Sequence, residues 1–326
     1  MADGKRAVKV GRRIVEVSNL GKVLYPGDGI TKGDLVEYYR RVAGRMLPHV
    51  RGRPVAMERY PDGIDGERIF QKDVPGYFPG WIDRAKVHKE GGTLQQVVCE
   101  QAATLVYLAN QACITPHVFL SRTERLDHPD QLIFDLDPAG DDFEGARRAA
   151  LALRSLLEEL GLPSFPKTTG GKGVHVTVPL DRRADFDTVR RFARDVAAVL
   201  AARHPDRLTT EQQKRNRKGR LYLDVMRNAY AQTAVPPYAV RARPGATVAT
   251  PLDWSEVEDP SLRPSAFTIG SVLARFEDTD PWKDLRRRGR SLSRARRRLD
   301  ALAEDGGARL SRRGRAGRGS PGAGRR

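Results

Sequence analysis

The chain has 326 residues, and 39% of them are hydrophobic, so most of it can bury a core in one large domain or two modest ones. No apolar run typical of a secretory signal occurs in the first 20 residues, and no segment approaches the ~18 apolar residues of a membrane span. Two cysteines, Cys99 and Cys113, do not make a disulfide framework. We therefore expect a monomeric protein in the reducing cytoplasm.

The positive charge of the chain is concentrated at one end. The formal net charge is +17, and residues 285–326 contribute +12 of it through 15 arginines and three acidic residues. A basic chain attracts polyanions, of which nucleic acid is the commonest large one. Arg, Gly and Ser dominate after residue 285, a composition typical of disorder. We interpret 285–326 as a disordered basic tail that either contacts nucleic acid or merely aids solubility.

Hydrophobic periodicity predicts strands and helices that alternate through residues 13–284. In chain order they are strand 13–17, helix 31–47, strand 53–59, helix 100–114, strand 131–137, helix 143–160, strand 174–178, helix 186–203, strands 221–225 and 238–241, and helix 267–276. Thr31 is a suitable N-cap for the first helix, which Pro48 is expected to end. Cys113 falls in the pattern of the second helix. The alternation predicts an α/β or α+β fold.

Strand 131–137 carries two acidic residues close together. Residues i and i+2 of a strand point to the same face, so Asp135 and Asp137 project together while Phe134 and Leu136 face the other side. Neighbouring carboxylates repel each other, and burying them requires a cation between them. Divalent metal ions are the usual partner when such a pair serves phosphoryl transfer. The alternative is a solvated strand end, where aspartate is common.

A glycine-rich segment, Thr168-Thr169-Gly170-Gly171-Lys172-Gly173, precedes strand 174–178. Three glycines allow backbone N–H groups to converge on one point, as they do in sites that bind phosphate, and Lys172 adds a positive charge. His175 lies on the strand face opposite the three valines of this strand. The spacing is not that of a Walker loop. The alternative is a tight turn followed by a half-buried histidine.

Two later segments place charge next to apolar residues. Asp224 lies in strand 221–225, where a carboxylate is costly without a partner. That partner is either Arg227 or the metal site begun by Asp135. Arg241 and Arg243 share one face of the strand predicted at 238–241, where they could bind a triphosphate or form a surface ion-pair ladder.

The order of these segments resembles the archaeo-eukaryotic primase superfamily, and most closely the polymerase domain of bacterial non-homologous end-joining ligase D. The resemblance runs from about residue 17 to residue 276. It is carried by Lys-Val-Leu-Tyr-Pro at 22–26, Thr31-Lys32, Gly52-Arg53-Pro54, Phe70-Gln71-Lys72, Phe134-Asp135-Leu136-Asp137-Pro138, Gly173-Val174-His175, Asp224 and Pro237-Tyr238-Ala239-Val240-Arg241. It implies an α+β fold whose primase-type catalytic core, residues 13–284, has an RRM-like antiparallel or mixed sheet flanked by helices.

The resemblance also implies roles for the matched residues. Two divalent ions, Mn²⁺ or Mg²⁺, would be held by Asp135, Asp137 and Asp224. The incoming nucleotide would be contacted by Thr169, Lys172, His175, Arg241, Arg243 and His117, although a purely structural role is the alternative for His117. Lys22 and Lys32 would bind the 5′-phosphate of a recessed DNA end, and Phe70 would stack on a template base.

The implied activity is that of a DNA-end-directed nucleotidyltransferase. It would extend a primer 3′-hydroxyl with NTPs or dNTPs by a two-metal mechanism, with manganese and ribonucleotides preferred, and fill gaps during double-strand break repair. The substrate would be DNA with 5′-phosphorylated ends or gaps at the nucleoid, and candidate partners are a Ku protein and a separate ATP-dependent DNA ligase. A replicative-type primase and a non-catalytic DNA end-binding or bridging factor are the alternatives.

The sequence departs from the family pattern at three places. Ile69-Phe70 stands where two adjacent aromatic residues are frequent, so only Phe70 can stack fully. Glu58 replaces a basic residue often found before the matched Arg59, which weakens a phosphate-binding role at that position. No Lys-x-Asp-Gly adenylation motif occurs, so we expect a form without a ligase module.

Overall fold

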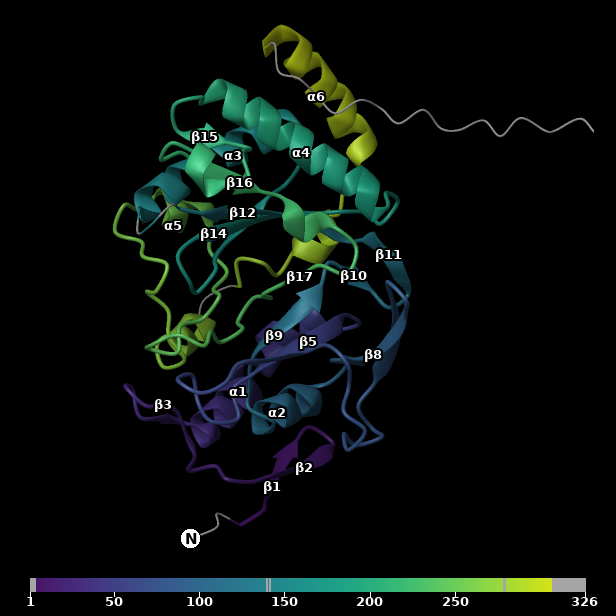
Figure 1. Cartoon of the computed structure of the whole chain (residues 1–326), viewed down its shortest axis with the longest axis vertical. Coiled ribbons are helices and arrows are strands. Elements are labelled where there is room, and N and C mark those ends of the chain that lie inside the picture. Colours follow the sequence, from purple (N-terminus) through teal and green to yellow (C-terminus); the bar gives the residue numbers. More distant parts are fainter. Residues whose placement is uncertain (1–3, 139, 141, 278–279, 307–326) are drawn as a thin grey trace, which may run out of the picture.

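The computed structural model describes residues 4–138, 140, 142–277 and 280–306. Its elements form two groups along the long axis of the molecule (Figure 1). One group contains the first sheet with helices α1 (Lys32–Val50) and α2 (Ala102–Asn110). The other contains the second sheet with α3 (Phe143–Glu159), α4 (Phe186–Arg203) and α6 (Leu292–Gly306). Each group has its own hydrophobic core. In the described part of the chain, no helix is long and apolar enough to cross a bilayer.

An antiparallel sheet with two helices forms the first group. The strand order is β17-β9-β5-β8-β7, and β6 pairs with β5. The strands are β5 (Pro54–Arg59), β6 (Ile69–Gln71), β7 (Arg84–Lys89), β8 (Gly92–Val98), β9 (Cys113–Phe119) and β17 (Thr233–Ala234). Helices α1 (Lys32–Val50) and α2 (Ala102–Asn110) pack against each other and share one core with β5 and β9.

Small hairpins complete this group. They pair β1 (Arg6–Val10) with β2 (Arg13–Val17), β3 (Val23–Tyr25) with β4 (Ile30–Thr31), and β10 (Ser121–Arg122) with β11 (Arg125–Pro129). Thr31 caps α1 through a capping box with Asp34, as the sequence predicts.

The second sheet has five strands in the order β13-β14-β12-β16-β15. They are β12 (Gln131–Asp137), β13 (Phe165–Thr168), β14 (Val174–Pro179), β15 (Leu208–Thr209) and β16 (Leu221–Asp224). The sheet is mixed, because β15 and β16 are parallel and the other neighbours are antiparallel. Phe134 and Leu136 point into the core beneath α3 (Phe143–Glu159) and α4 (Phe186–Arg203), which leaves the alternate residues on the opposite face.

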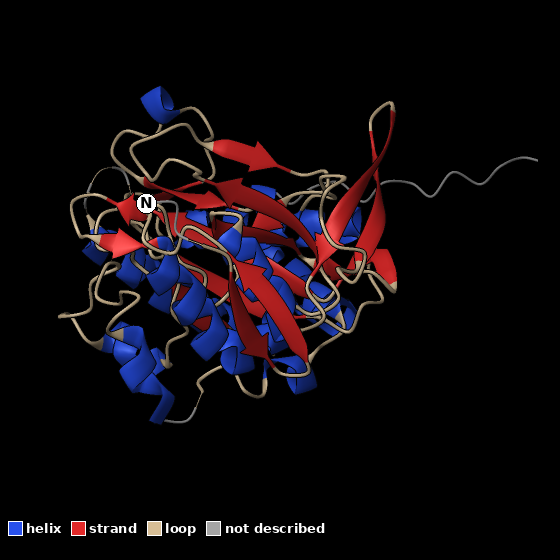
Figure 2. Cartoon of the chain, turned by 90° about the horizontal axis from the view of Figure 1, so that it is seen from below, coloured by secondary structure: helices blue, strands red, loops and turns tan. Residues whose placement is uncertain are grey.

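Figure 2 shows the strands running through the body of the molecule with the helices packed against them. This arrangement confirms the α+β class. The predicted boundaries of the strand at 131–137 and the helix at 186–203 agree with β12 and α4.

Three predicted elements are wrong in detail. Helix α1 continues through Pro48 to Val50, because a proline in the last turn removes only one hydrogen bond. Helix α2 ends at Asn110, and Ala112 adopts a φ of 54°, so Cys113 begins strand β9 instead of lying in a helix. The segment predicted as helix 267–276 forms only a 3-10 helix, η3 (Val272–Glu277).

The prediction of disorder from residue 285 is wrong for residues 285–306. This segment forms the 3-10 helix η4 (Leu285–Arg288) and helix α6 (Leu292–Gly306). Leu292, Ala295, Leu299 and Ala303 lie at helical spacing and are buried in the second core, where α6 packs along α4. The arginines between them hid this apolar stripe in the composition. Residues 307–326 lie outside the described part of the chain.

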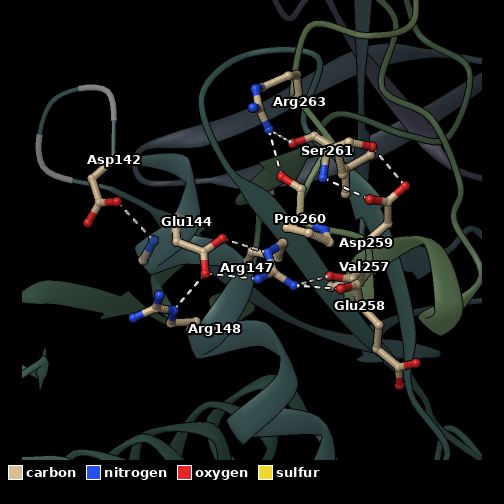
Figure 3. Close-up of polar contacts among 12 residues, drawn as sticks. Asp142, Glu144, Arg147, Arg148, Val257, Glu258, Asp259, Pro260, Ser261 and Arg263 are labelled. Carbon is tan, nitrogen blue, oxygen red and sulfur yellow. Dashed lines mark hydrogen bonds and ion pairs between the residues drawn. The ribbon is translucent and has the colours of Figure 1, made fainter.

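A polar network anchors the short helix α5 (Trp254–Glu258) to the start of α3 (Figure 3). Arg147 donates to the carbonyl oxygens of Val257 and Glu258 at 3.0 and 2.9 Å, and Glu144 accepts hydrogen bonds from Arg147 and Arg148. Because α3 follows β12 in the chain, the network fixes the segment around α5 relative to the strand that carries Asp135 and Asp137.

Candidate active site

Four polar residues form a cross-strand row on the face of the second sheet that is turned away from α3 and α4. Lys167 of β13 pairs with His175 of β14, His175 pairs with Asp135 of β12, and Asp135 pairs with Asp224 of β16. Directly opposite residues in neighbouring strands bring their side chains to within about 5 Å at Cβ. Asp137 lies two residues further along β12 on the same face. The structure therefore brings together the three aspartates that the sequence singles out.

The row opens onto a cavity of about 560 Å³ between the two sheets. Nine of the twelve site residues proposed from the sequence line it: His117, Asp135, Asp137, Thr169, Lys172, His175, Asp224, Arg241 and Arg243. His117 belongs to β9 of the first sheet, so both halves of the molecule contribute to the cavity. Lys22, Lys32 and Phe70 do not line it.

Charges around the aspartates separate their pKa values. Burial would raise the pKa of Asp135, but His175 and Arg227 hold it well below its usual range. Surrounding protein atoms and the charge of Asp135 raise the pKa of Asp137 to about 6, although Asp137 is exposed at the end of its strand. Burial, followed by Asp135, raises the pKa of Asp224. Carboxylates that raise one another's pKa values are those that a bound cation would relieve.

The carboxylates are presently engaged with protein groups. Arg227 Nε lies 3.3 Å from Asp135 Oδ2, His175 Nε2 lies 3.2 Å from Asp135 Oδ1, and Asp224 Oδ1 accepts a hydrogen bond from the backbone of Met226 at 2.7 Å. In the described residues, no three His, Cys, Asp or Glu side chains are already arranged around a common metal position.

The donor set nevertheless fits divalent cations. Asp135 Oδ1 is buried and accepts no well-directed hydrogen bond from the described part of the chain, which is unfavourable for a carboxylate oxygen unless a cation binds it. Asp137 and Asp224 supply further oxygen ligands, which hard divalent ions prefer.

The glycine-rich segment does not form the open cluster of backbone N–H groups that the sequence predicts. Thr169 Oγ1 accepts hydrogen bonds from the backbone N–H of both Gly171 and Gly173 at 3.2 Å. The N–H groups of Gly171 and Gly173 are therefore already satisfied, and the Thr169 hydroxyl shapes the turn. The exposed side chain of Lys172 lies at its tip, beside the cavity.

Gly173 is required by the close approach of β14 to Asp137. A Cβ atom at Gly173 would collide with Asp137 Oδ1 and with the carbonyl oxygen of Leu136. The absence of a side chain lets the turn lie directly beside the acidic strand. The glycine therefore fixes the distance between the basic turn and the carboxylates.

Arg241 and Arg243 lie in a loop and not in the strand predicted at 238–241, where only an isolated bridge joins Val240 to Val248. Arg241 Nη1 donates to the carbonyl oxygen of Thr169 at 2.8 Å, and the Arg243 guanidinium lies beside Gly171. Arg241 thus braces the glycine-rich turn, and both arginines border the cavity. The alternative of a surface ion-pair ladder does not describe them.

His117 is held at the cavity wall by a buried carboxylate. Its Nε2 lies 2.7 Å from Oε2 of Glu58, and both side chains are nearly buried, with exposed fractions of 13% and 10%. Phe70, which is 39% exposed, packs edge-on against the imidazole with ring centroids 5.3 Å apart. The aromatic residue proposed to stack on a template base therefore adjoins the cavity through His117.

Lys22 and Lys32 lie next to each other, away from the cavity. The backbone N–H of Lys32 donates to the carbonyl oxygen of Lys22 at 2.8 Å across the β3–β4 hairpin. Lys22 Nζ pairs with Asp62 at 2.7 Å, whereas Lys32 is buried and donates to the carbonyl oxygen of Asn110 at 3.1 Å. The backbones of the two lysines are thus adjacent, their side chains have different partners, and Lys32 is not a simply solvated lysine.

Sequence reasoning missed one cation of the site, Lys167, and considered a different partner for a second, Arg227. Lys167 is 1% exposed and its Nζ has no hydrogen-bond partner among the residues that the structure describes, while burial and Arg241 lower its pKa to about 7. Only its position two residues before Thr169 pointed to it. Arg227 was considered as a partner of Asp224, but the structure pairs it with Asp135.

Comparisons with known proteins agree with this geometry. The family described as "LigD, primase-polymerase domain" matches residues 31–282. The chain is 35% identical over 308 residues to the multifunctional non-homologous end joining protein LigD of Mycobacterium bovis, covering 88% of this chain and 39% of that protein. It is also 35% identical over 265 residues to the bifunctional non-homologous end joining protein LigD of Bacillus subtilis, covering 81% of this chain and 42% of that protein.

A solved structure is similar over nearly its whole length. The polymerase domain from Mycobacterium tuberculosis ligase D in complex with DNA superimposes with a TM-score of 0.79 at 33% identity, covering 85% of this chain and 99% of that one. The chain thus spans about two fifths of the length of these two relatives and almost all of the solved polymerase domain from Mycobacterium tuberculosis ligase D. The primase-type fold expected from the sequence is confirmed, and the chain belongs to the LigD primase-polymerase family.

Proposed function

We propose that this chain is a DNA-end-directed nucleotidyltransferase that extends a primer 3′-hydroxyl with nucleoside triphosphates during end joining. The observation that carries the proposal is the convergence of Asp135, Asp137 and Asp224 on one sheet face, beside a cavity bordered by cations. The hydroxyl oxygen would bond to the α-phosphorus while the bond to the β-phosphate oxygen breaks and pyrophosphate leaves. Membership in the primase-polymerase family supports this reaction class.

The aspartates would hold the metal ions of the reaction. Two divalent cations, Mn²⁺ or Mg²⁺, bound by Asp135, Asp137 and Asp224 would lower the pKa of the primer hydroxyl and stabilise the leaving pyrophosphate. Asp135 would exchange Arg227 for these ions, because a divalent charge at a buried carboxylate outweighs a guanidinium at 3.3 Å. Asp224 lies on β16, which is nearer the edge of the sheet than β12, and it would face the 3′-hydroxyl of the primer.

The basic residues of the cavity would bind the triphosphate. Lys172 at the tip of the glycine-rich turn and Arg243 beside it would neutralise phosphate oxygens, and Arg241 would brace the turn through its hydrogen bond to Thr169. His175 is buried, and burial together with Lys167 lowers its pKa to about 4, so it would act as a neutral hydrogen-bonding group. Thr169 would keep the turn in shape through its hydroxyl.

The DNA end would be recognised outside the cavity. Lys22 would exchange Asp62 for the 5′-phosphate of a gap, with Lys32 beside it. Phe70 would stack on the template base near His117. A Ku protein that delivers the end and a separate ATP-dependent DNA ligase that seals it would complete the repair.

The test is extension of a 5′-phosphorylated gapped duplex in the presence of Mn²⁺ or Mg²⁺. The double substitution Asp135→Ala and Asp137→Ala should reduce extension by about a thousandfold or more, since the metal ligands supply several kcal/mol of transition-state stabilisation. DNA binding should persist. The control is Asp127→Ala, which removes an exposed carboxylate of β11 away from the cavity.

The same assay separates the alternatives. Full extension by the double variant would rule out the assigned metal ligands. Extension by the wild type that ignores the 5′-phosphate would favour a replicative-type primase. DNA binding by a wild type that never extends would favour a non-catalytic end-bridging factor.

A further inference from the structure

Tyr77 has the most exposed ring among the tyrosine, phenylalanine and tryptophan residues that the structure describes, yet this ring is held in place. Its exposed fraction is 63%, compared with 39% for Phe70. The ring packs edge-on against the buried Phe78 with centroids 5.3 Å apart, and Phe78 packs edge-on against Tyr107 at 5.0 Å. The Tyr77 hydroxyl accepts a hydrogen bond from Nη1 of Arg59 at 3.3 Å. The ring is therefore anchored while most of its surface stays open to solvent.

Arg59 is itself fixed to the neighbouring strand β6 and to the end of α2. Its Cα partner in β6 is Ile69, and its Nη1 also donates to Oε1 of Gln71 at 2.7 Å. Its Nε donates to the carbonyl oxygen of Gln111 at 2.9 Å. These acceptors and the Tyr77 hydroxyl are all uncharged. The contacts therefore hold a guanidinium beside the exposed ring without neutralising its positive charge.

The same ring is connected to the lysines on the other side. The Tyr77 hydroxyl donates to Oε1 of Gln111 at 3.4 Å, and the preceding residue, Asn110, accepts a hydrogen bond from Nζ of Lys32 at 3.1 Å. Tyr77 is thus linked through Arg59 to β6, which carries the proposed template contact Phe70. Through the end of α2 it is linked to a lysine proposed to bind the 5′-phosphate.

An exposed aromatic ring beside a guanidinium fits a nucleotide at the end of a DNA strand. Every nucleobase has a face that can stack on an aromatic ring, and a nearby cation attracts the phosphate backbone. At a gap, the nucleotide that carries the 5′-phosphate lies beside the last template base that remains to be copied. Its base is therefore expected between the template contact and the phosphate contact, where Tyr77 lies.

We propose that Tyr77 stacks on the base of the nucleotide that carries the 5′-phosphate and so holds the far border of the gap. The inference rests on the proposed function, because that function supplies the gapped substrate and the contacts of its 5′-phosphate. Arg59 is a positioning residue that keeps the ring upright through its hydroxyl. The stack needs the downstream strand, so it strengthens binding of gapped DNA and leaves binding of a bare primer–template unchanged.

Dissociation constants of the full chain for three DNA molecules test this proposal. The first is a 5′-phosphorylated gapped duplex, and the second is the same duplex with an abasic nucleotide at the 5′-phosphorylated end. The third is the primer–template without the downstream strand. The variants are Tyr77→Ala, which removes the ring, and Tyr77→Phe, the matched control that retains the ring and loses only the hydroxyl. Because the side chain is exposed, both variants should fold.

We expect Tyr77→Ala to weaken binding of the gapped duplex by about tenfold, the loss typical of one base stacked on an aromatic ring. Tyr77→Phe should stay within about threefold of the wild type, because the stacking face is retained. The abasic nucleotide should weaken the wild type by the same factor and leave Tyr77→Ala unaffected, since partners in one contact are not additive. All three proteins should bind the primer–template equally.

Three results overturn the inference. They are an unchanged affinity of Tyr77→Ala for the gapped duplex, which would leave the ring to a protein partner, an equal loss on the gapped duplex and the primer–template, and additive losses from the variant and the abasic nucleotide. Each of them leaves the proposed function intact if the wild type extends primers in the gap. A wild type that fails to extend any primer refutes the proposed function itself.

Discussion

Gly173 shows how a single residue sets the spacing of the site. Its hydrogen atom occupies the place where a Cβ atom would collide with Asp137 and with the backbone of Leu136. No rotamer change relieves the collision with a backbone carbonyl. The position therefore links the backbone of the glycine-rich turn to the placement of one proposed metal ligand.

We predict that Gly173→Ala displaces the turn from Asp137 and lowers primer extension by about a hundredfold, a loss typical of misplaced catalytic groups. Single-turnover extension of gapped DNA measures the effect. Gly44→Ala is the matched control, because Gly44 lies in α1 and a Cβ there would meet no atom of the described residues within 4 Å, so alanine should stabilise the protein by about 0.5–1 kcal/mol. Equal activity of the two variants would show that the close approach is unimportant.

For individual residues, the sequence predicts the face on which a side chain lies where residues alternate along a strand. The two-residue period of β12 correctly places Asp135 and Asp137 on the face opposite Phe134 and Leu136. It could not reveal Lys167, because a single lysine in a short strand has no pattern. Its role depends on the pairing of β13 with β14, which is set by register and not by composition.

Helix α6 shows how an element can escape sequence analysis. Four of its 15 residues are arginines, all in the first half, and its buried apolar stripe consists of Leu292, Ala295, Leu299 and Ala303. The stripe is buried because α4 offers a complementary apolar face, which composition alone does not show. The stability of this helix therefore comes from packing and not from propensity.

We predict that Leu299→Ala lowers the free energy of unfolding by about 2–4 kcal/mol, because it leaves a cavity at a fully buried position between α6 and α4. Urea denaturation followed by circular dichroism measures this change. Leu302→Ala, three residues along the helix and only partly buried, serves as the control and should cost distinctly less. An unchanged midpoint for Leu299→Ala would mean that α6 does not pack stably in solution.

At the scale of the whole molecule, buried histidines make stability depend on pH. His49, in the last turn of α1, is surrounded by the rings of Tyr238 and Trp282, and burial lowers its pKa from 6.5 to about 4. The unfolded chain therefore binds a proton between about pH 6.5 and pH 4 that the folded protein excludes. The stabilisation by neutral His49 is complete above pH 6.5 and is lost as the pH falls toward 4.

Urea midpoints of the wild type and His49→Phe between pH 4.5 and 7.5 test this expectation. The wild type should lose stability relative to the variant on acidification, by on the order of 1–3 kcal/mol. A difference between the two proteins that stays constant with pH would contradict the assignment of His49.

The cavity itself is a property of the whole molecule. Its lining residues come from segments between His117 and Arg243 and from both sheets. Motif order allowed the aspartates and the glycine-rich turn to be grouped by resemblance, but no local pattern places β9 opposite β12. For this reason the contact between Glu58 and His117, and the position of His117 at the cavity wall, became visible only in the structure.

The most direct test concerns Asp224, which is remote in sequence from Asp135 but opposite it in the sheet. Single-turnover extension of a 5′-phosphorylated gapped duplex should fall about a thousandfold or more in Asp224→Asn while the fold and DNA binding are retained, and Asp127→Asn should match the wild type. Extension by Asp224→Asn within a few-fold of the wild type would contradict the claim that three aspartates form one catalytic centre.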